Sequence, residues 1–180
     1  GGLGFFELFI NGRRVSDDVF VPANSLYNYR SNSRMNYFNS DVFTYRTYSV
    51  VYDVKDYLKE GKNTVVVHLG NGWYGETGNQ DERVDAFGKP KLVYKLEITD
   101  NEGDKRFVAD ETDKWEPSFI TQNRLYLGEH QDLRLYDNMI FRTGYDDSEW
   151  ENVVIAETHE CEYDIQDFEP DRITETRVPT

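Results

Sequence analysis

Residues 70–75 read Gly-Asn-Gly-Trp-Tyr-Gly and combine flat aromatic rings with a side-chain amide. Trp73 and Tyr74 could stack on the apolar C–H face of a sugar ring, while Asn71 could hydrogen-bond a pair of hydroxyls. The alternative is structural: Trp73 closes one end of the fold, and Asn71 holds a turn in the left-handed region. Asn71, Trp73 and Tyr74 are therefore candidate carbohydrate-binding residues.

A second motif, residues 128–134, reads Gly-Glu-His-Gln-Asp-Leu-Arg. Glu129 and Asp132 offer hydrogen-bond acceptors and Arg134 offers donors. From the residues alone, a partly buried structural ion pair is one interpretation.

One acidic loop suggests a metal. Asp81, Glu82 and Asp85 supply hard oxygen ligands of the kind that calcium prefers. A solvated acidic loop explains the same residues, so the metal site stays undetermined and calcium is the one candidate cofactor.

Composition narrows the class of protein. The 180 residues suit one domain with a core that needs no disulfide or metal. The net charge of −14, with no basic run, repels phosphate backbones and disfavours nucleic acid as a partner. No apolar run is long enough to span a bilayer, so we expect no membrane partner. The compartment cannot be inferred.

Short strand patterns dominate the chain, and 13 Tyr with 11 Phe favour pleated surfaces. We expect one short helix, residues 53–63, which stops at Gly61. Residues 11–12, Asn-Gly, predict a tight turn after the first long strand. The expected strands are 5–10, 44–54, 64–70, 91–99, 105–111, 138–143 and 153–157. This pattern predicts an all-β fold, a jelly-roll or galactose-binding-like β-sandwich with long loops and at most one or two short helices.

Two long loops and an acidic tail complete the organisation. Residues 22–41 are rich in Asn, Ser and Tyr, and residues 70–90 are rich in Gly and acid, compositions that fit either ligand binding or simple insertion. We expect a sugar-recognition sandwich over residues 1–156. Residues 157–180 are expected to form a connecting segment toward a following domain that this chain does not contain.

Several segments, in order along nearly the whole chain, resemble the N-terminal domain of bacterial α-L-rhamnosidases. They are GLGFFELFINGRRV, YDVKDYLKEGKNTVVVHLGNGWYG, KPKLVYKLEIT, DETDKWEPS, LGEHQDLRL, GYDDSEWENV and PDRITETRVP. GNGWYG is the most specific of these. GEHQDLR matches a recurrent acidic-basic motif of the family, and this match implies that Glu129, Asp132 and Arg134 contact a sugar or the next domain, which makes them further candidates for carbohydrate binding. The resemblance implies a jelly-roll sandwich whose relatives bind terminal L-rhamnose, some with calcium, while the catalytic acids lie on a later helical barrel.

This chain departs from the family pattern at one loop. Relatives carry a short Pro-Gly-Trp-Thr-Asp-Tyr loop after the second strand, whereas residues 22–41 here are longer and lack Trp. The longer loop either rebuilds the sugar site or closes it.

The sequence singles out no catalytic residue. Hydrolysis of a glycosidic bond needs two carboxylates at a fixed separation, and nothing in the spacing of the 34 acidic residues distinguishes such a pair. We therefore expect an accessory carbohydrate-recognition or scaffold domain of an α-L-rhamnosidase, not catalytic alone. Its expected partners are an L-rhamnose-containing glycan and the catalytic domain of the same polypeptide. The alternatives are a purely structural domain packing on that catalytic domain, a stand-alone sandwich enzyme and a protein-binding β-sandwich.

Overall fold

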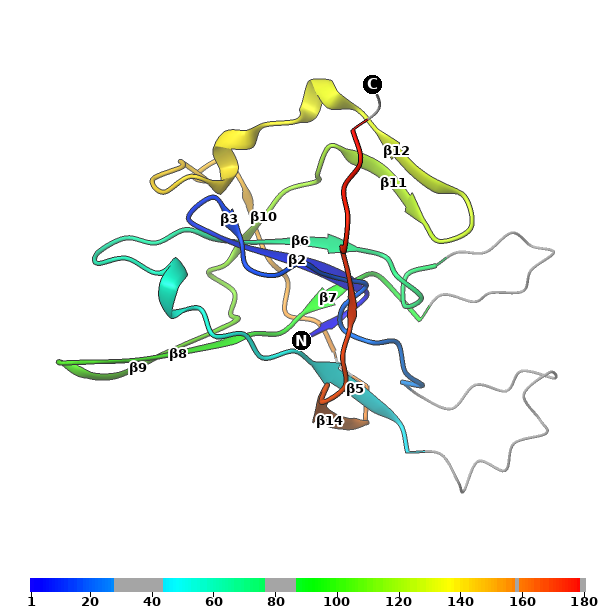
Figure 1. Cartoon of the computed structure of the whole chain (residues 1–180), viewed down its shortest axis with the longest axis horizontal. Helices are drawn as coiled ribbons and strands as arrows, with labels where there is room; N and C mark the ends of the chain where they lie inside the picture. The colour runs from blue at the N-terminus through cyan, green and yellow to red at the C-terminus, as the bar shows by residue number, and fades with distance from the viewer. Residues whose placement is uncertain (28–43, 77–86, 158, 179–180) are drawn as a thin grey trace.

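The computed structural model describes residues 1–27, 44–76, 87–157 and 159–178. Within them the fold is an all-β sandwich, as the sequence predicts, and its helices are single 3-10 turns (Figure 1). The strands are β1 Gly2–Leu3, β2 Phe5–Ile10, β3 Arg13–Arg14, β4 Asp18–Val19, β5 Arg46–Ser49, β6 Val65–Gly70, β7 Lys91–Leu92, β8 Lys95–Asp100, β9 Gly103–Val108, β10 Lys114–Trp115, β11 Ile120–Arg124, β12 Gly128–Gln131, β13 Glu151–Asn152, β14 Glu162–Ile165 and β15 Asp171–Arg172. The 3-10 helices are η2 Lys55–Tyr57, η3 Leu133–Leu135 and η4 Asn138–Phe141.

The three-stranded sheet β3-β2-β6 crosses the middle of the molecule. Strands β2 and β6 pair antiparallel along their full lengths, from Phe5 opposite Gly70 to Ile10 opposite Val65. The predicted turn between β2 and β3 is confirmed, because Asn11 and Gly12 have φ of 51° and 83°. Since β6 ends at Gly70, the segment that follows it begins at the edge of this sheet.

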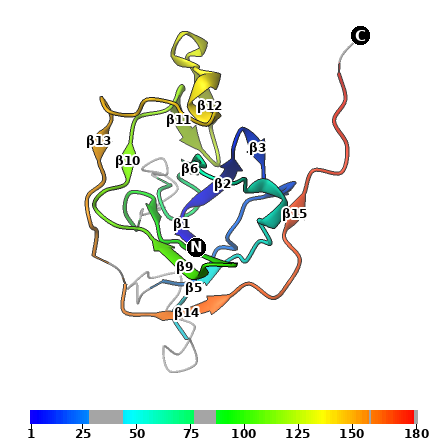
Figure 2. The same ribbon diagram turned by 90° about the vertical axis from the view of Figure 1, so that its left-hand side faces the viewer.

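The C-terminal segment pairs with strands from the first third of the chain. β14 lies parallel to β5, and β15 pairs antiparallel with β4, with Asp171 opposite Val19 (Figure 2). Residues of the expected connecting segment therefore add two strands to the sandwich, while the boundary at residue 157 stays a prediction.

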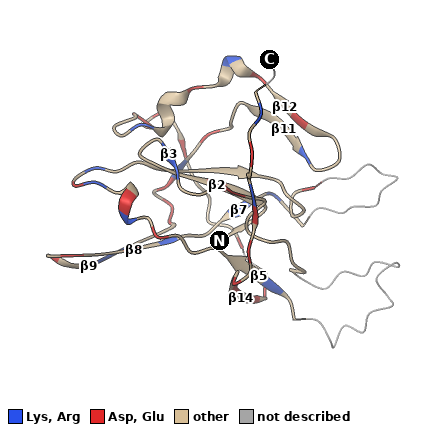
Figure 3. Cartoon of the chain, viewed as in Figure 1, with Lys and Arg blue, Asp and Glu red and all other residues tan. Residues whose placement is uncertain are grey.

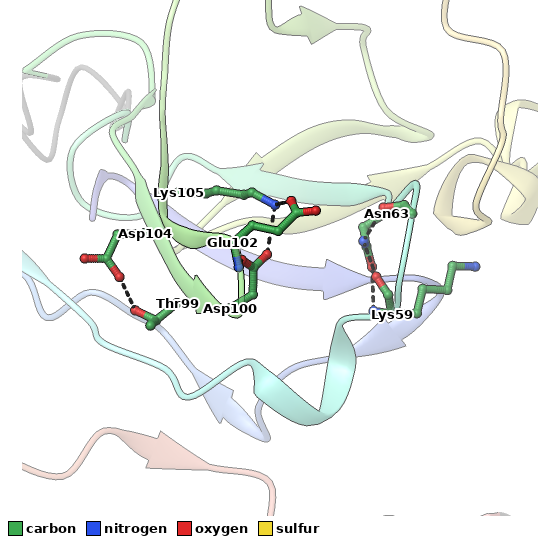
Figure 4. A network of polar contacts seen from close by, with 8 residues as sticks. Lys59, Asn63, Thr99, Asp100, Glu102, Asp104 and Lys105 are labelled. Carbon is green, nitrogen blue, oxygen red and sulfur yellow. Dashed lines mark hydrogen bonds and ion pairs between the residues drawn. The ribbon is translucent and has the colours of Figure 1, made fainter.

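The predicted hairpin after residue 91 is confirmed as β8–β9, with a break in the strand before Lys95. At its turn Lys105 Nζ lies 2.8 Å from Asp100 Oδ2 and 2.9 Å from Glu102 Oε2 (Figure 4). Thr99 Oγ1 donates to Asp104 Oδ1 at 2.7 Å. These contacts fix the turn without any apolar packing.

The expected helix shortens to η2. The predicted start and stop were wrong, because η2 has Val54 as its N-cap and ends at Tyr57, before Gly61. Asp53 Oδ1 still accepts a hydrogen bond from the Lys55 amide, and Gly61 has φ of 81° in the turn that follows. Just after Gly61, the Asn63 side chain accepts from the Lys59 amide and donates to the Lys59 carbonyl oxygen (Figure 4). These local side-chain bonds replace further helical turns.

Two expected strands were wrong. Residues 138–143 contain η4, because Asp137 Oδ1 accepts from the Met139 amide and starts a turn instead of an extended strand. Residues 153–157 form no strand beyond β13, and Val154 and Ile155 are 86% and 67% exposed. A β-branched run without a neighbouring strand to pair with stays irregular.

The core gathers aromatic side chains around the first strand. Leu3, Tyr27 and Tyr74 form its buried cluster, and Phe87 packs against it. Tyr27 meets Tyr74 edge-on at 5.3 Å between ring centroids. Acidic and basic residues are scattered over the whole ribbon (Figure 3). Among the described residues, no helix has the length and apolar character that crossing a bilayer requires.

Candidate functional site

Asn71, the first residue after β6, is held against the hairpin of β11 and β12. Its backbone amide donates to Asn123 Oδ1 at 3.0 Å, and its Nδ2 donates to the Asn123 carbonyl oxygen at 2.6 Å. The Asn71 carbonyl oxygen accepts from the Gly75 amide at 2.8 Å, which closes a turn. A Cβ at Gly75 would lie 2.9 Å from Asn71 Oδ1, so the turn requires glycine there. The structure thereby places Asn71, one of the predicted site residues, against the β11–β12 hairpin.

Glu129 joins the same network through Asn123. Asn123 Nδ2 donates to Glu129 Oε1 at 2.7 Å, and Gln131 Nε2 donates to Glu129 Oε2 at 3.0 Å. The carboxylate is exposed, so it can accept further hydrogen bonds from hydroxyl donors in solvent. Asn71 and Glu129, which are 58 positions apart, therefore lie on one polar edge.

Trp73 provides an aromatic surface beside this edge. Its side chain is 39% exposed and meets Tyr126, at the hairpin tip, edge-on at 5.7 Å between ring centroids. Tyr126 is itself 51% exposed. An exposed indole held by a neighbouring ring can present one face to a sugar.

Tyr74 points the other way, into the core. Its side chain is 1% exposed, its hydroxyl lies 2.9 Å from His159 Nε2, and its ring stacks on Phe87. Neither face of the ring is open to a ligand in this conformation. Trp73 and Tyr74 are adjacent in the sequence, but the first is exposed to solvent and the second is buried in the core.

Asp132 and Arg134 form an ion pair of their own. Arg134 donates from Nε and Nη2 to the two carboxylate oxygens at 2.8 and 2.6 Å, and its amide donates to Oδ1 to start η3. These bonds hold the pKa of Asp132 below its usual range. The Arg134 side chain is 89% exposed. The pair belongs to the segment after β12, and within the described residues no hydrogen bond or ion pair joins it to Asn71 or Glu129.

Two residues of this region were missed from the sequence. Glu76 is fully buried and accepts from Arg124 Nε at 3.2 Å and from the Leu125 amide at 2.7 Å. It therefore ties the end of the glycine-rich segment to the hairpin. Asn123, which links Asn71 to Glu129, was missed too. Neither had a sequence signal, because each stands in an ordinary polar context.

The expected calcium ligands, Asp81, Glu82 and Asp85, lie outside the described residues. Within residues 1–27, 44–76, 87–157 and 159–178, no three His, Cys, Asp or Glu side chains come together as a metal site would require. Calcium binding therefore stays a prediction for this chain. What the described part of the chain does offer is an amide and carboxylate edge beside an exposed indole, which is chemistry for hydrogen-bonding and stacking on a polyhydroxylated ligand.

Comparison with known proteins places this arrangement in one family. The family model described as "Alpha-L-rhamnosidase N-terminal domain" matches residues 1–175. An α-L-rhamnosidase of Formosa agariphila is 32% identical over 155 residues, and one of Streptomyces avermitilis is 28% identical over 156 residues. These matches cover 83% and 82% of this chain but only 15% and 13% of the relatives.

Solved structures agree with this match. The α-L-rhamnosidase of Dictyoglumus thermophilum is 32% identical and superposes with a TM-score of 0.77, over 97% of this chain and 17% of that one. The Streptomyces avermitilis enzyme, determined in complex with L-rhamnose, is 24% identical, with a TM-score of 0.80 over 97% of this chain and 16% of that one. The second likeness speaks for the fold alone. The chain thus spans about a sixth of the length of the proteins it matches.

Proposed function

This chain belongs to the family of α-L-rhamnosidase N-terminal domains, and from that premise we propose that it is an accessory carbohydrate-recognition domain for terminal L-rhamnose. Bond cleavage would then take place on another part of an α-L-rhamnosidase polypeptide. The observation that carries the proposal is the edge formed by Asn71, Asn123 and Glu129 beside the exposed Trp73.

The geometry of this edge supports a sugar as its ligand. Hydroxyl groups of a pyranose would donate to the Glu129 carboxylate, while the Trp73 face covers the apolar C–H groups of the ring. The network already orders Asn71 and Glu129, so binding would require little further ordering of side chains. Affinity should still be modest, about 10 μM to 1 mM, because each hydroxyl exchanges a water bond for a protein bond at little net gain.

Titration calorimetry with L-rhamnose tests the proposal. We expect heat of binding to the unmodified chain and at least a tenfold loss in Trp73→Ala. Trp115→Ala is the matched control, since Trp115 is 46% exposed and lies away from this edge on β10. Equal affinities of the two variants, or no binding to the unmodified chain, would reject L-rhamnose recognition at this edge.

Two further measurements test whether calcium contributes to binding and whether this chain has catalytic activity. Titration with calcium present and with chelator shows whether a metal contributes to affinity. An aryl α-L-rhamnoside should not be hydrolysed by this chain, and turnover at enzymatic rates would overturn the accessory role.

A second candidate function rests on a different observation. Large apolar side chains stay exposed along the hairpin tip and the two 3-10 helices after it: Leu125 38%, Tyr126 51%, Leu127 62%, Leu133 69%, Leu135 60%, Tyr136 50% and Met139 46%. An apolar surface of this extent favours contact with another protein surface. The catalytic domain of the same polypeptide is the candidate partner, and the chain would then act as a structural domain that packs on it.

A further inference from the structure

A separate cavity of about 360 Å³ opens where the C-terminal strand β15 meets the segment that leads to η2. Its lining includes Asp18, Tyr52, Tyr57, Phe168 and Arg172, and it shares no residue with the edge around Trp73. The two segments lie beside each other in Figure 2. Its volume falls within the range of about 300–1,000 Å³ that is typical of small-molecule sites.

One wall of the cavity is a fixed polar group. Arg172 Nε donates to Asp18 Oδ1 at 3.0 Å, and Asp18 is only 8% exposed. Burial and the neighbouring Asp18 raise the pKa of Tyr52 to about 12, so its hydroxyl stays protonated even at pH values where an ordinary tyrosine has begun to ionise. The wall therefore combines a carboxylate, a phenolic hydroxyl and a guanidinium that is 57% exposed on its side chain.

The polar wall continues inward to a smaller cavity. Arg14 Nε is buried without a hydrogen-bond partner among the described residues, in a space of about 10 Å³ that Asp18 and Tyr52 also line. A space of this size holds about one water molecule. Such a water would accept a hydrogen bond from Arg14 Nε and would lie next to Asp18 and Tyr52.

Aromatic rings also line the cavity. The Tyr57 hydroxyl donates to the Val15 carbonyl oxygen at 2.8 Å, and the Arg13 guanidinium lies 4.4 Å from the centre of the Tyr57 ring, so this ring is held in place. Phe168 is 48% exposed and meets Tyr48 edge-on at 5.5 Å between ring centroids. A cavity lined by both hydrogen-bonding groups and aromatic rings suits a ligand with polar edges and apolar faces.

We propose that this cavity is a second saccharide site, which takes one neutral pyranose unit independently of the edge around Trp73. Sugar hydroxyls would donate to Asp18 and Asp53. Among the described residues only Oδ1 of Asp53 accepts a hydrogen bond, which leaves its second carboxylate oxygen for a ligand. The ring of the sugar would lie against Phe168. A neutral unit fits better than an anionic one, because two carboxylates line the cavity and the chain carries a net charge of −14.

Amide chemical-shift mapping by NMR tests the site with methyl α-L-rhamnopyranoside and methyl β-D-glucopyranoside as probes. We expect at least one of them to shift amides of residues 15–18, 50–53 and 166–172 saturably, with a dissociation constant of about 1–30 mM. Sodium D-glucuronate should shift them at least fivefold less at equal concentration. No shift with either neutral probe at about 100 mM, or stronger shifts with glucuronate, would overturn the proposal.

Variants locate the binding and guard against misfolding. Phe168→Ala should weaken the neutral probe at least fivefold, whereas Phe107→Ala, at a side chain 50% exposed on the β8–β9 hairpin, should not. Asp53→Asn should weaken it about fivefold, the equivalent of one lost hydrogen bond, while Asp56→Asn leaves it unchanged. Equal effects of the paired variants would contradict the site.

Failure here and failure of the rhamnose edge are distinguishable. Trp73→Ala should abolish shifts near residues 71–76 and 123–129 and leave those near residues 166–172 intact. If Trp73→Ala removed both sets of shifts, the second site would not be independent, and the proposal would fail.

Discussion

Asn71 donates two hydrogen bonds to Asn123, one from its backbone amide to Oδ1 and one from its side chain to the carbonyl oxygen. The two residues stand on segments 52 positions apart, and this doubled contact fixes both the distance and the orientation between them. Because Asn123 also donates to Glu129, the position of the exposed carboxylate depends on the same bond pair.

Asn123→Ala removes the acceptor for the Asn71 amide and the donor to Glu129. We expect the free energy of unfolding to fall by about 1–3 kcal/mol, because a partly buried amide loses its partner. Urea denaturation measures this change. Asn152→Ala, which removes side-chain bonds at the exposed edge of β13, should cost less than about 1 kcal/mol. A larger loss in the control would mean that the Asn71 contact is not special.

Glu76 and Arg124 should couple strongly in a double-mutant cycle. Glu76→Gln should destabilise the fold by about 3 kcal/mol, since Glu76 is fully buried and holds both Arg124 and the Leu125 amide. With Arg124→Met as the second change, we expect a coupling energy of about 1–3 kcal/mol.

The exposed pair Lys95–Glu97, whose side chains are 50% and 61% exposed, is the control for this cycle. Its coupling should be below about 0.5 kcal/mol. Equal coupling in the two cycles would show that burial of Glu76 adds nothing.

Tyr52 should make the fold sensitive to alkali. Its pKa is raised from 10.0 to about 12 in the folded state, so below pH 10 both states keep the proton and the contribution is complete. Between pH 10 and 12 the unfolded chain loses this proton first, and stability falls with rising pH. Tyr52→Phe should therefore lose less stability across this interval than the unmodified chain, as thermal unfolding at each pH would measure.

The control for Tyr52→Phe is a tyrosine substitution outside the cavity. Tyr163→Phe, at a ring 56% exposed, should retain the full alkaline loss. If Tyr52→Phe loses as much stability between pH 10 and 12 as Tyr163→Phe does, Asp18 and burial do not govern this proton.

The exposed leucines after β12 can be replaced without unfolding the domain. Leu133→Ser combined with Leu135→Ser should change the free energy of unfolding by less than about 0.5 kcal/mol, because the side chains are 69% and 60% exposed. If this surface packs on a catalytic domain, the double variant should bind at least tenfold more weakly to an α-L-rhamnosidase from which the corresponding N-terminal domain has been deleted. Unchanged binding would argue against packing through this surface.

Local patterns predicted the elements whose partners lie nearby. The β2 run, the Asn11-Gly12 turn and the β8–β9 hairpin follow from side-chain alternation and turn chemistry. The 138–143 segment shows the limit, because its apolar residues resemble a strand while Asp137 starts a turn that ends it.

The sequence predicted which residue types could bind a sugar, but not which of their side chains face solvent. Trp73 and Tyr74 carry the same signal, and only the turn after β6 decides that one faces solvent and the other the core. Glu76 is one of 34 acidic residues, and its burial depends on a hairpin some 50 positions away. Asn123 lies in a polar strand and gains its role only through contacts distant in sequence.

The pairing of β15 with β4 has a consequence for how the chain folds. Asp171 sits opposite Val19, so this ladder closes a loop of roughly 150 residues, and β14 with β5 closes another of more than 110. Contacts this distant slow the search for the native topology, and sandwiches of high contact order fold in about milliseconds to seconds. During synthesis, β4 and β5 would therefore lack these pairing partners until residues 162–172 have left the ribosome.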